Sequence, residues 1–315
     1  MAFQLSQPTL VIGLGGAGSK LAINAHKNLD ADCLLISHDK HDLKHDCSTI
    51  SINTGSIVNP STYLIRGYAD KISDDIKSKI SNYSSIVLVA NLAGKAGSAI
   101  APIVTHLCKE SGKDLISFAI MPFKFEKDRI FQAGISLKRL RESSTCIVVD
   151  NDALLDCNPD LTQKACYEIA NSAILHVINS LKSSYLADGT NILSTSKSAY
   201  DIETSLRESI KMLYEDAPPA SVKRSILYVL GNDVSVGTLN SITSISSKVF
   251  REDTTQVDLA TSSAEKSNVI MLSTVQGETR FDRYDPLGVI PSDHVLDWQD
   301  PDCSINCELN LYQLE

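Results

Sequence analysis

A cluster of four glycines near the start of the chain has the residue types and spacing of a phosphate-binding loop. Gly13, Gly15, Gly16 and Gly18 follow the apolar run 10–12 and precede an apolar helical pattern. Glycine has no Cβ, so the backbone can approach an anion closely. The free N–H groups at a helix start favour negative charge. The pattern therefore predicts a strand, a phosphate-binding turn and a helix, and hence a nucleotide-binding protein or a descendant of one.

The same glycines also match the dinucleotide-binding fingerprint Gly-x-Gly-x-x-Gly. Asp39 follows near the end of the second expected strand. A Rossmann dehydrogenase keeps the acid that binds its ribose close to this place. These residues by themselves leave an NAD-binding Rossmann oxidoreductase open as an alternative.

Composition and charge exclude several classes of protein. The chain has 315 residues, with 43% hydrophobic and 21% charged, which is ordinary for a globular protein with room for two domains. A net charge of −9 disfavours a nucleic-acid partner. No apolar run approaches the ~20 residues that span a bilayer, and the first residues lack the pattern of a signal peptide. We expect a cytoplasmic protein without direct membrane insertion.

The eight cysteines are scattered along the chain, and we interpret them as reduced thiols, several of them buried. Cys303 and Cys307 have no second pair at the spacing of a zinc site. Three histidines and Cys47 within residues 38–47 could bind a metal. A solvated loop after a strand gives the same pattern, so we predict no metal site.

Apolar runs and helical patterns alternate from residue 8 to about 150. They predict an α/β nucleotide-binding domain over 1–160, with a Rossmann-like parallel sheet covered on both faces. A long apolar helix is expected over 161–184. A smaller α/β C-terminal domain should occupy 185–315, with a polar connector over 185–220. Further expected elements are helices over 68–80 and 239–250 and strands over 225–230 and 268–275.

Later segments carry motifs that a dehydrogenase has no reason to keep. The specific ones are Pro122-Phe-Lys-Phe-Glu126 and Asn151-Asp-Ala-Leu-Leu155, with supporting matches at 55–60 and 91–102. With the glycine cluster, they make the chain resemble the tubulin/FtsZ superfamily of GTP-binding filament proteins, FtsZ in particular. The resemblance runs from about residue 10 to residue 274. It implies a GTP-binding domain, a long central helix and a smaller α/β C-terminal domain.

The resemblance also implies roles for single residues. The backbone of the glycine cluster would hold the α- and β-phosphates. Glu126 would accept hydrogen bonds from the ribose, and Asn151 would bond the base edge. Tyr167 would lie against the base, and Asn171, one helical turn later, would replace the carboxylate that grips guanine. Each also has a structural alternative: a solvated carboxylate, a turn residue or a helix packing position. The other expected nucleotide-binding residues are Asp39, Gly94, Lys95, Gly97 and Ser98.

Two departures from the family pattern lie where the chemistry would occur. Within 91–102, alanines and Lys95 interrupt the glycine run, and each lost glycine adds a Cβ where the backbone must approach phosphate. Lys95 either places its ammonium on a phosphate or points into solvent. Counting at the family's spacing puts the catalytic loop at Asn191. Leu193 and Ser196 then replace the two acids that polarise the attacking water.

We therefore predict a divergent FtsZ-like cytoskeletal or cell-division-related protein without efficient GTP hydrolysis. Its cofactor would be GTP or GDP, bound weakly or lost. It would act by head-to-tail self-association, as a dimer, or as a scaffold with a related filament protein. A weakly active polymerising GTPase is the nearer alternative, and the NAD-dependent oxidoreductase is the distant one.

Overall fold

A mixed ten-stranded sheet forms the centre of the structure, a computed structural model that describes residues 3–43, 46–55, 57–182, 186–187, 189–197, 201–232, 234–250, 255–264 and 267–284. In order across the sheet the strands are β3 (Ser48–Ser51), β2 (Asp32–Ser37), β1 (Thr9–Leu14), β4 (Ser85–Asn91), β5 (Asp114–Met121), β6 (Thr145–Asp150), β7 (Thr190–Thr195), β10 (Asn268–Val275), β8 (Val222–Leu230) and β9 (Gln256–Ser262). From β3 at one edge to β7, neighbouring strands in this order are parallel, whereas β10 is antiparallel to both of its neighbours. The expected α/β fold is confirmed.

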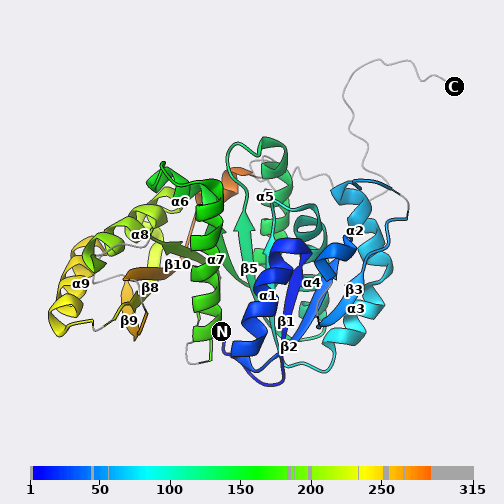
Figure 1. The fold of residues 1–315 in the computed structure, drawn as a ribbon, viewed down its shortest axis with the longest axis horizontal. Helices are drawn as coiled ribbons and strands as arrows, with labels where there is room; N and C mark the ends of the chain where they lie inside the picture. Colours follow the sequence, from blue (N-terminus) through cyan, green and yellow to red (C-terminus); the bar gives the residue numbers. More distant parts are fainter. Residues whose placement is uncertain are drawn as a thin grey trace, which may run out of the picture.

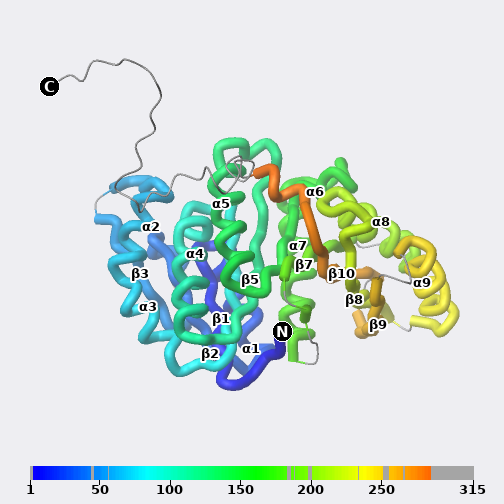
Figure 2. The backbone as a smooth tube through the Cα atoms, turned by 180° about the vertical axis from the view of Figure 1, so that it is seen from behind, coloured from blue at the N-terminus to red at the C-terminus, as the bar shows by residue number. Residues whose placement is uncertain are grey.

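Helices cover both faces of this sheet. One face carries α1 (Gly15–Leu29), α6 (Asn151–Cys157) and α7 (Gln163–Ser180), and the other carries α2 (Thr62–Lys71), α3 (Ser73–Ile80), α4 (Lys95–Glu110), α5 (Lys127–Ser143), α8 (Ile202–Asp216) and α9 (Val236–Val249). Figure 1 shows α1 and α7 in front of the sheet, and Figure 2 shows α4 and α5 on its opposite side. A short 3-10 turn at Arg280–Tyr284 follows the last strand.

The strands are apolar on both sides because both sides are buried. In β4, Leu88 packs in the cluster under α4, whereas Val87 and Val89 pack in the cluster under α1. Side chains of a strand alternate between the faces of a sheet. A strand covered on both faces therefore has a continuous apolar sequence, which is the pattern that predicted the parallel sheet.

Strand β7 makes the sheet continuous from one half of the chain to the other. It pairs in parallel with β6 and antiparallel with β10, and all six of its residues are buried. The segment 185–220, predicted as a polar connector, contains this strand and the amphipathic helix α8. The division of the chain at residues 160 and 185 stays a prediction.

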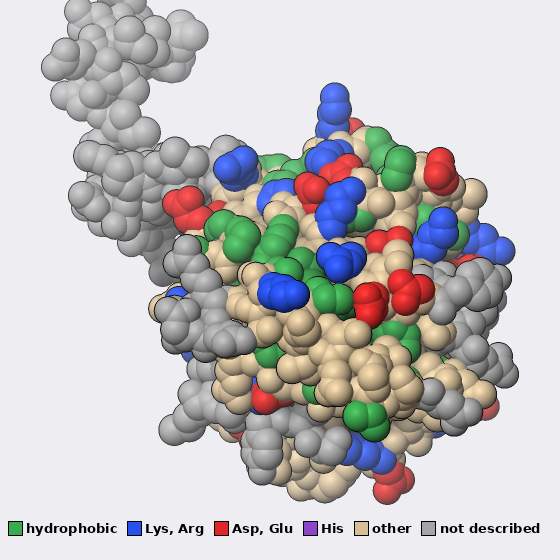
Figure 3. Space-filling view, turned by 90° about the vertical axis from the view of Figure 1, so that its left-hand side faces the viewer, with side chains coloured by type: hydrophobic (Ala, Val, Ile, Leu, Met, Phe, Trp, Pro, Cys, Tyr) green, Lys and Arg blue, Asp and Glu red, His purple; other side chains and the backbone are tan. Residues whose placement is uncertain are grey.

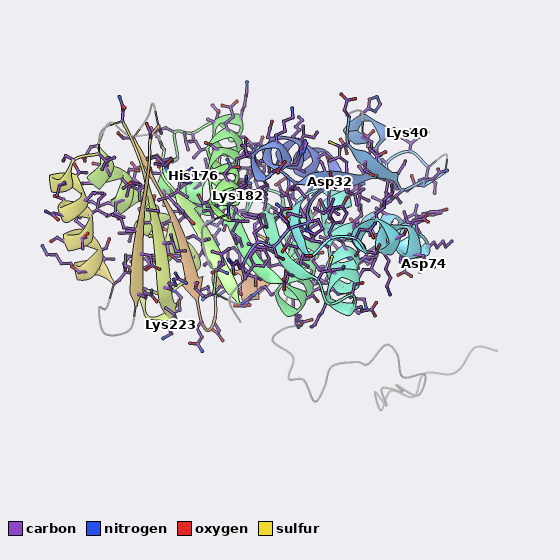
Figure 4. The ribbon with its side chains drawn as sticks, turned by 90° about the horizontal axis from the view of Figure 1, so that it is seen from below. Asp32, Lys40, Asp74, His176, Lys182 and Lys223 are labelled. Carbon is purple, nitrogen blue, oxygen red and sulfur yellow. The ribbon has the colours of Figure 1, made fainter. Side chains whose placement is uncertain are left out.

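Helix α7 lies within the predicted range 161–184 and packs between the two halves. Its residues contact α1 on one side. On the other side the ring of His176, labelled in Figure 4, meets the ring of Tyr228 in β8 edge-on at 5.3 Å between centroids. Burial among these groups lowers the pKa of His176. The helix therefore links the parallel strands to the C-terminal strands.

The surface at the end of the molecule that carries α8, α9 and β9 is mixed in character. Figure 3 shows this end, the left-hand side of Figure 1, where acidic, basic and apolar side chains are interspersed. None of the described helices is long and apolar enough to cross a membrane. Cys303 and Cys307, considered above as metal ligands, lie outside the described residues.

Candidate nucleotide-binding site

The carboxyl ends of five parallel strands bring the predicted site residues to one edge of the sheet. Gly15 follows β1, Asp39 follows β2, Gly94 follows β4, Glu126 follows β5 and Asn151 follows β6. The order of the strands reverses between β1 and β4. In open α/β sheets, ligands bind in the crevice beyond the strand ends at such a reversal. The topology therefore places these residues where a ligand is expected.

Two helix starts meet at this crevice. Helix α1 begins at Gly15, whose φ of +65° lies in the left-handed region, and a Cβ there would be 3.0 Å from the Ala96 Cβ in the first turn of α4. Neither helix start has a capping side chain or an acid in its first turn. Their leading N–H groups are therefore open to an anion, with the positive ends of both helix dipoles behind them.

Two of the four clustered glycines serve packing. A Cβ on Gly18 would lie 2.4 Å from the Val89 carbonyl oxygen, and a Cβ on Gly13 would lie 2.6 Å from the Gly18 carbonyl oxygen. These glycines let α1 close onto β1 and β4. Gly15 and Gly16 remain at the helix start, so the loop combines a close helix–strand contact with an anion-binding turn.

The acid that lies against this loop is Asp42. A Cβ on Gly16 would be 2.7 Å from Asp42 Oδ1, and the Ser37 hydroxyl donates to Asp42 Oδ2 at 2.7 Å. Asp39, the predicted acid, instead accepts from the His41 backbone N–H at 2.8 Å. Hydrogen bonds from His41 lower the pKa of Asp39, which is exposed. Sequence reasoning missed Asp42 because its distance from the glycines depends on the turn after β2.

In the structure, which holds no nucleotide, Lys95 contacts a neighbouring loop. Its ammonium donates to the Asn59 side-chain oxygen at 2.6 Å and to the Pro60 carbonyl oxygen at 3.0 Å. It therefore holds the end of the 57–60 loop over the start of α4. A phosphate at this helix start would compete with that loop for the ammonium.

Gly97 and Ser98 in the first turn of α4 also have packing roles. A Cβ on Gly97 would lie 2.0 Å from the Asn91 carbonyl oxygen. Ser98 is buried, its hydroxyl lies 3.5 Å from the Lys95 carbonyl oxygen, and its own carbonyl accepts from the Ser136 hydroxyl at 2.7 Å. In this arrangement the Ser98 hydroxyl is directed back along the helix.

Glu126 and Tyr167 are brought together by aromatic packing. Glu126 accepts from the Phe123 backbone N–H at 3.2 Å and from Arg129 at 2.7 Å. The Phe123 ring meets Tyr167 edge-on at 5.4 Å and stacks on Phe125 at 5.0 Å. Phe125 is 62% exposed, so the cluster offers an aromatic face to a ligand beside an acid. A ribose would have to compete with Arg129 for the Glu126 carboxylate.

Asn151 carries an unused acceptor. The side chain is buried at the start of α6, and its Nδ2 lies 3.5 Å from the Met121 carbonyl oxygen. Its Oδ1 accepts no hydrogen bond from any described residue. A buried amide oxygen without a donor is unfavourable, so a ligand N–H would stabilise it. Asn171 is half-buried one turn after Tyr167 on α7.

A charged network that sequence reasoning missed holds the start of α6. Arg280 places Nη2 2.9 Å from Asp150 Oδ2 and 2.8 Å from Asp152 Oδ2, and its Nε lies 3.9 Å from Asp216. Asp150 caps α6 by accepting from the Asp152 backbone N–H at 2.8 Å. The partners are far apart in the sequence, so no local pattern could indicate them. Asn151 lies between Asp150 and Asp152, two members of this network.

The pair of buried acids in this network should make stability depend on pH. Burial, and then the neighbouring Asp150 carboxylate, raise the pKa of Asp216 well above its usual range, against the opposing charge of Arg280. Glu215 adds further negative charge. An acid whose pKa is raised by folding favours the folded state fully below its unfolded pKa of ~4, and this contribution is lost as the pH rises through the folded pKa.

We therefore expect Asp216→Asn, whose amide does not ionise, to gain stability relative to the unmodified chain as the pH rises. The gain is limited to ~1.4 kcal/mol per pH unit for one proton. Urea unfolding between about pH 4 and pH 8 measures the difference. Asp70→Asn removes the same charge from an exposed position on α2 and controls for net charge. A difference that is constant with pH would contradict a raised pKa for Asp216.

The positions at which the family's spacing predicts the catalytic loop, Asn191, Leu193 and Ser196, lie in or directly after a strand. Asn191 and Leu193 belong to the buried strand β7, and Ser196 follows it directly. The Asn191 side chain accepts from Thr274 at 2.7 Å, and Ser196 donates to Asn268 at 2.8 Å. Side chains buried in the middle of a sheet are poorly placed to contact a neighbouring subunit. Helix α7 connects to β7 through residues 181–189, and the catalytic role of these positions stays a prediction.

Comparisons with known proteins agree with this fold. Residues 8–159 match the sequence model of the Tubulin/FtsZ family, GTPase domain. The chain is similar to the cell division protein FtsZ 2 of Halobacterium salinarum, with 27% identity over 184 residues, which are 55% of this chain and 46% of that protein. The chain is thus a distant member of the Tubulin/FtsZ family. This assignment replaces the NAD-binding alternative.

Solved structures show the same architecture. An empty FtsZ dimer of M. jannaschii matches with a TM-score of 0.69 at 18% identity, over 89% of this chain and 92% of that one. CetZ2 of Haloferax volcanii, in a GTPγS-bound protofilament, matches with a TM-score of 0.64 at 18% identity, over 88% and 96%. At this identity the structural likeness shows the fold. The sequence match spans about half the length of the curated relatives.

Proposed function

We propose that the chain binds a guanine nucleotide weakly, does not hydrolyse it efficiently, and acts by self-association or as a scaffold in a filament system. The meeting of two uncapped helix starts at the sheet's reversal point supports nucleotide binding. The unpartnered Oδ1 of Asn151 beside the aromatic cluster supports a base with N–H donors. The family assignment favours GTP or GDP over other nucleotides as the ligand.

Weak binding is expected because a nucleotide has to displace existing contacts. Lys95 is bonded to Asn59 and Pro60, and the Glu126 carboxylate is paired with Arg129. The Ser98 hydroxyl is directed back along the helix, 3.5 Å from the Lys95 carbonyl oxygen. These losses fall mainly where the terminal phosphate would lie. GDP and GTP should therefore bind within about tenfold of each other, a difference below ~1.4 kcal/mol.

The absence of efficient hydrolysis rests on the chain between α7 and β7. The family resemblance implies a pair of acids in a loop after the central helix, donated to the nucleotide of the next subunit. Residues 181–189 contain one acid, Asp188, which lies outside the described residues. Orienting the attacking water is a large part of phosphoryl-transfer catalysis, so losing an acid removes much of the rate.

We expect GTP turnover to stay at background at every protein concentration. Phosphate release measured against protein concentration tests this, with sedimentation of the same samples reporting self-association. A rate that rises cooperatively to about 10⁻²–10⁻¹ s⁻¹, a barrier of about 19–20 kcal/mol, would instead support a polymerising GTPase. Assembly into filaments without turnover would support the scaffold.

Self-association is supported by the solved relatives, because the FtsZ structure of M. jannaschii is a dimer and the CetZ2 structure is a protofilament. A head-to-tail contact joins two different surfaces and gives an open filament, whereas a two-fold contact gives a closed dimer. Because no GTP hydrolysis would trigger disassembly, we expect either assembly to be static. Light scattering that decays as GTP is consumed would contradict this.

A further inference from the structure

Two thiols and an imidazole lie together at the edge of the sheet opposite the nucleotide site. The sulfurs of Cys33 and Cys47 and a ring nitrogen of His26 all lie within 4.8 Å of one another. Figure 4 views the molecule toward the amino ends of the parallel strands and labels Asp32, the neighbour of Cys33. The trio is thus separated from the glycine loop by the length of α1.

The last turn of α1, strand β2 and the residue before β3 contribute to this cluster. Leu34 of β2 pairs with Ser48 of β3, so the preceding residues, Cys33 and Cys47, are adjacent at the strand ends. Both pack with the apolar cluster on the face covered by α1. His26 belongs to the last turn of α1 and lies over them. Cys33 is 7% exposed, whereas Cys47 and His26 are half-buried, so solvent reaches one side.

A backbone carbonyl fixes the tautomer of the His26 imidazole. His26 Nδ1 lies 3.2 Å from the Ala31 carbonyl oxygen, which can only accept a hydrogen bond. The neutral ring therefore carries its proton on Nδ1 and a lone pair on Nε2. A backbone carbonyl that fixes the tautomer in this way is the usual outer partner of a metal-binding histidine.

The spacing fits a tetrahedral ion. Zn²⁺ binds thiolate sulfur at ~2.3 Å and imidazole nitrogen at ~2.0–2.1 Å, which puts ligand atoms roughly 3.5–3.8 Å apart. The three atoms lie within 4.8 Å of one another, so an ion would have to draw them only slightly closer. Without an ion, burial and the neighbouring Cys47 raise the pKa of the Cys33 thiol.

We propose that Cys33, Cys47 and His26 bind a thiophilic divalent ion, Zn²⁺, with water as the fourth ligand. Binding forms two metal–sulfur bonds and one metal–nitrogen bond, and the two thiol protons pass to solvent. The ion would tie the end of α1 to the start of β3. The segment between β2 and β3 contains Asp42, which lies against the glycine loop. By holding the end of this segment, the metal would restrain the position of Asp42. The proposal does not depend on whether the chain binds a nucleotide.

A Co²⁺ titration of the reduced full chain tests the site, in a Cys303→Ser/Cys307→Ser background that removes the terminal thiols. We expect one equivalent of Co²⁺ to give intense thiolate charge-transfer absorption and tetrahedral d–d bands, both abolished by one equivalent of Zn²⁺. Cys47→Ser and His26→Gln should each lower the affinity by more than the ~10–100-fold that loss of an outer partner causes.

Cys157→Ser removes a half-buried thiol outside the cluster and should leave the titration unchanged. Circular dichroism verifies that each variant is folded, and two separate ligand variants guard against a failure of either one. Thiolate absorption that survives Cys47→Ser would overturn the proposal. So would a reduced chain that binds no Co²⁺ but forms a Cys33–Cys47 disulfide with an added oxidant, because the pair would then be a redox couple.

Discussion

Gly97→Ala is expected to destabilise the protein by roughly 3 kcal/mol or more, the upper end of what overpacking costs. The added Cβ would lie 2.0 Å from the Asn91 carbonyl oxygen and 2.8 Å from its carbonyl carbon. Both atoms are backbone, so no rotamer change relieves the contact. The start of α4 must move away from the end of β4, and with it one of the two helix starts that form the anion site.

Gly67→Ala is the matched control because it makes the same change inside a helix. No heavy atom lies within 4 Å of a Cβ at this position in α2. Alanine is favoured over glycine in a helix, so this variant should be more stable by about 0.5–1 kcal/mol. Guanidinium unfolding of the two variants measures both effects. Equal effects of the same sign would show that the close approach at Gly97 is not required for the fold.

Arg280→Met is expected to cost about 3–5 kcal/mol, the range for removing one partner of a buried ion pair. Asp150 and Asp216 are fully buried, and Asp152 is nearly so. Arg280 contacts the carboxylates of all three. Methionine has a similar volume but leaves these acids without a cation, so the start of α6 should loosen and Asn151 should lose its position.

Arg283→Met provides the control for Arg280→Met. Arg283 is exposed in the same short turn, and exposed charges contribute little to stability. Its replacement should change the unfolding free energy by less than about 0.5 kcal/mol. Adding Asp216→Asn to Arg280→Met should recover part of the loss, because one uncompensated acid is removed. Similar losses for the two arginine variants would show that the buried network is not what Arg280 supports.

Much of the fold was predictable because it follows from local patterns. The strand expected over 268–275 coincides with β10, and the glycine cluster marks the turn between β1 and α1. A strand buried on both faces requires a continuous apolar run, and a helix against a sheet requires an apolar stripe. Both patterns involve residues that are close together in the chain, so the sequence alone is enough to detect them.

The edges and junctions of the sheet were not predictable in this way. The helix expected over 68–80 is two helices that divide at Ile72. Strand β9 is an exposed edge strand with little apolar content, and β7 has only Ile192 and Leu193 as large apolar residues. Whether such a segment becomes a strand depends on the neighbours that pair with it. For β7 these neighbours are β6 and β10, which are distant in the sequence.

The sequence by itself determined the family, the order of the main elements and the edge of the sheet where a ligand would bind, because motifs and hydrophobic periodicity are local. Only the tertiary structure decided which side chains meet. It brought Arg280 to Asp150 and Asp216, Asp42 to the glycine loop, and Cys33 to Cys47 and His26. It also placed Asn191 and Leu193 inside the sheet. These contacts join residues through chain crossings and helix packing, for which no spacing along the chain gives a signal.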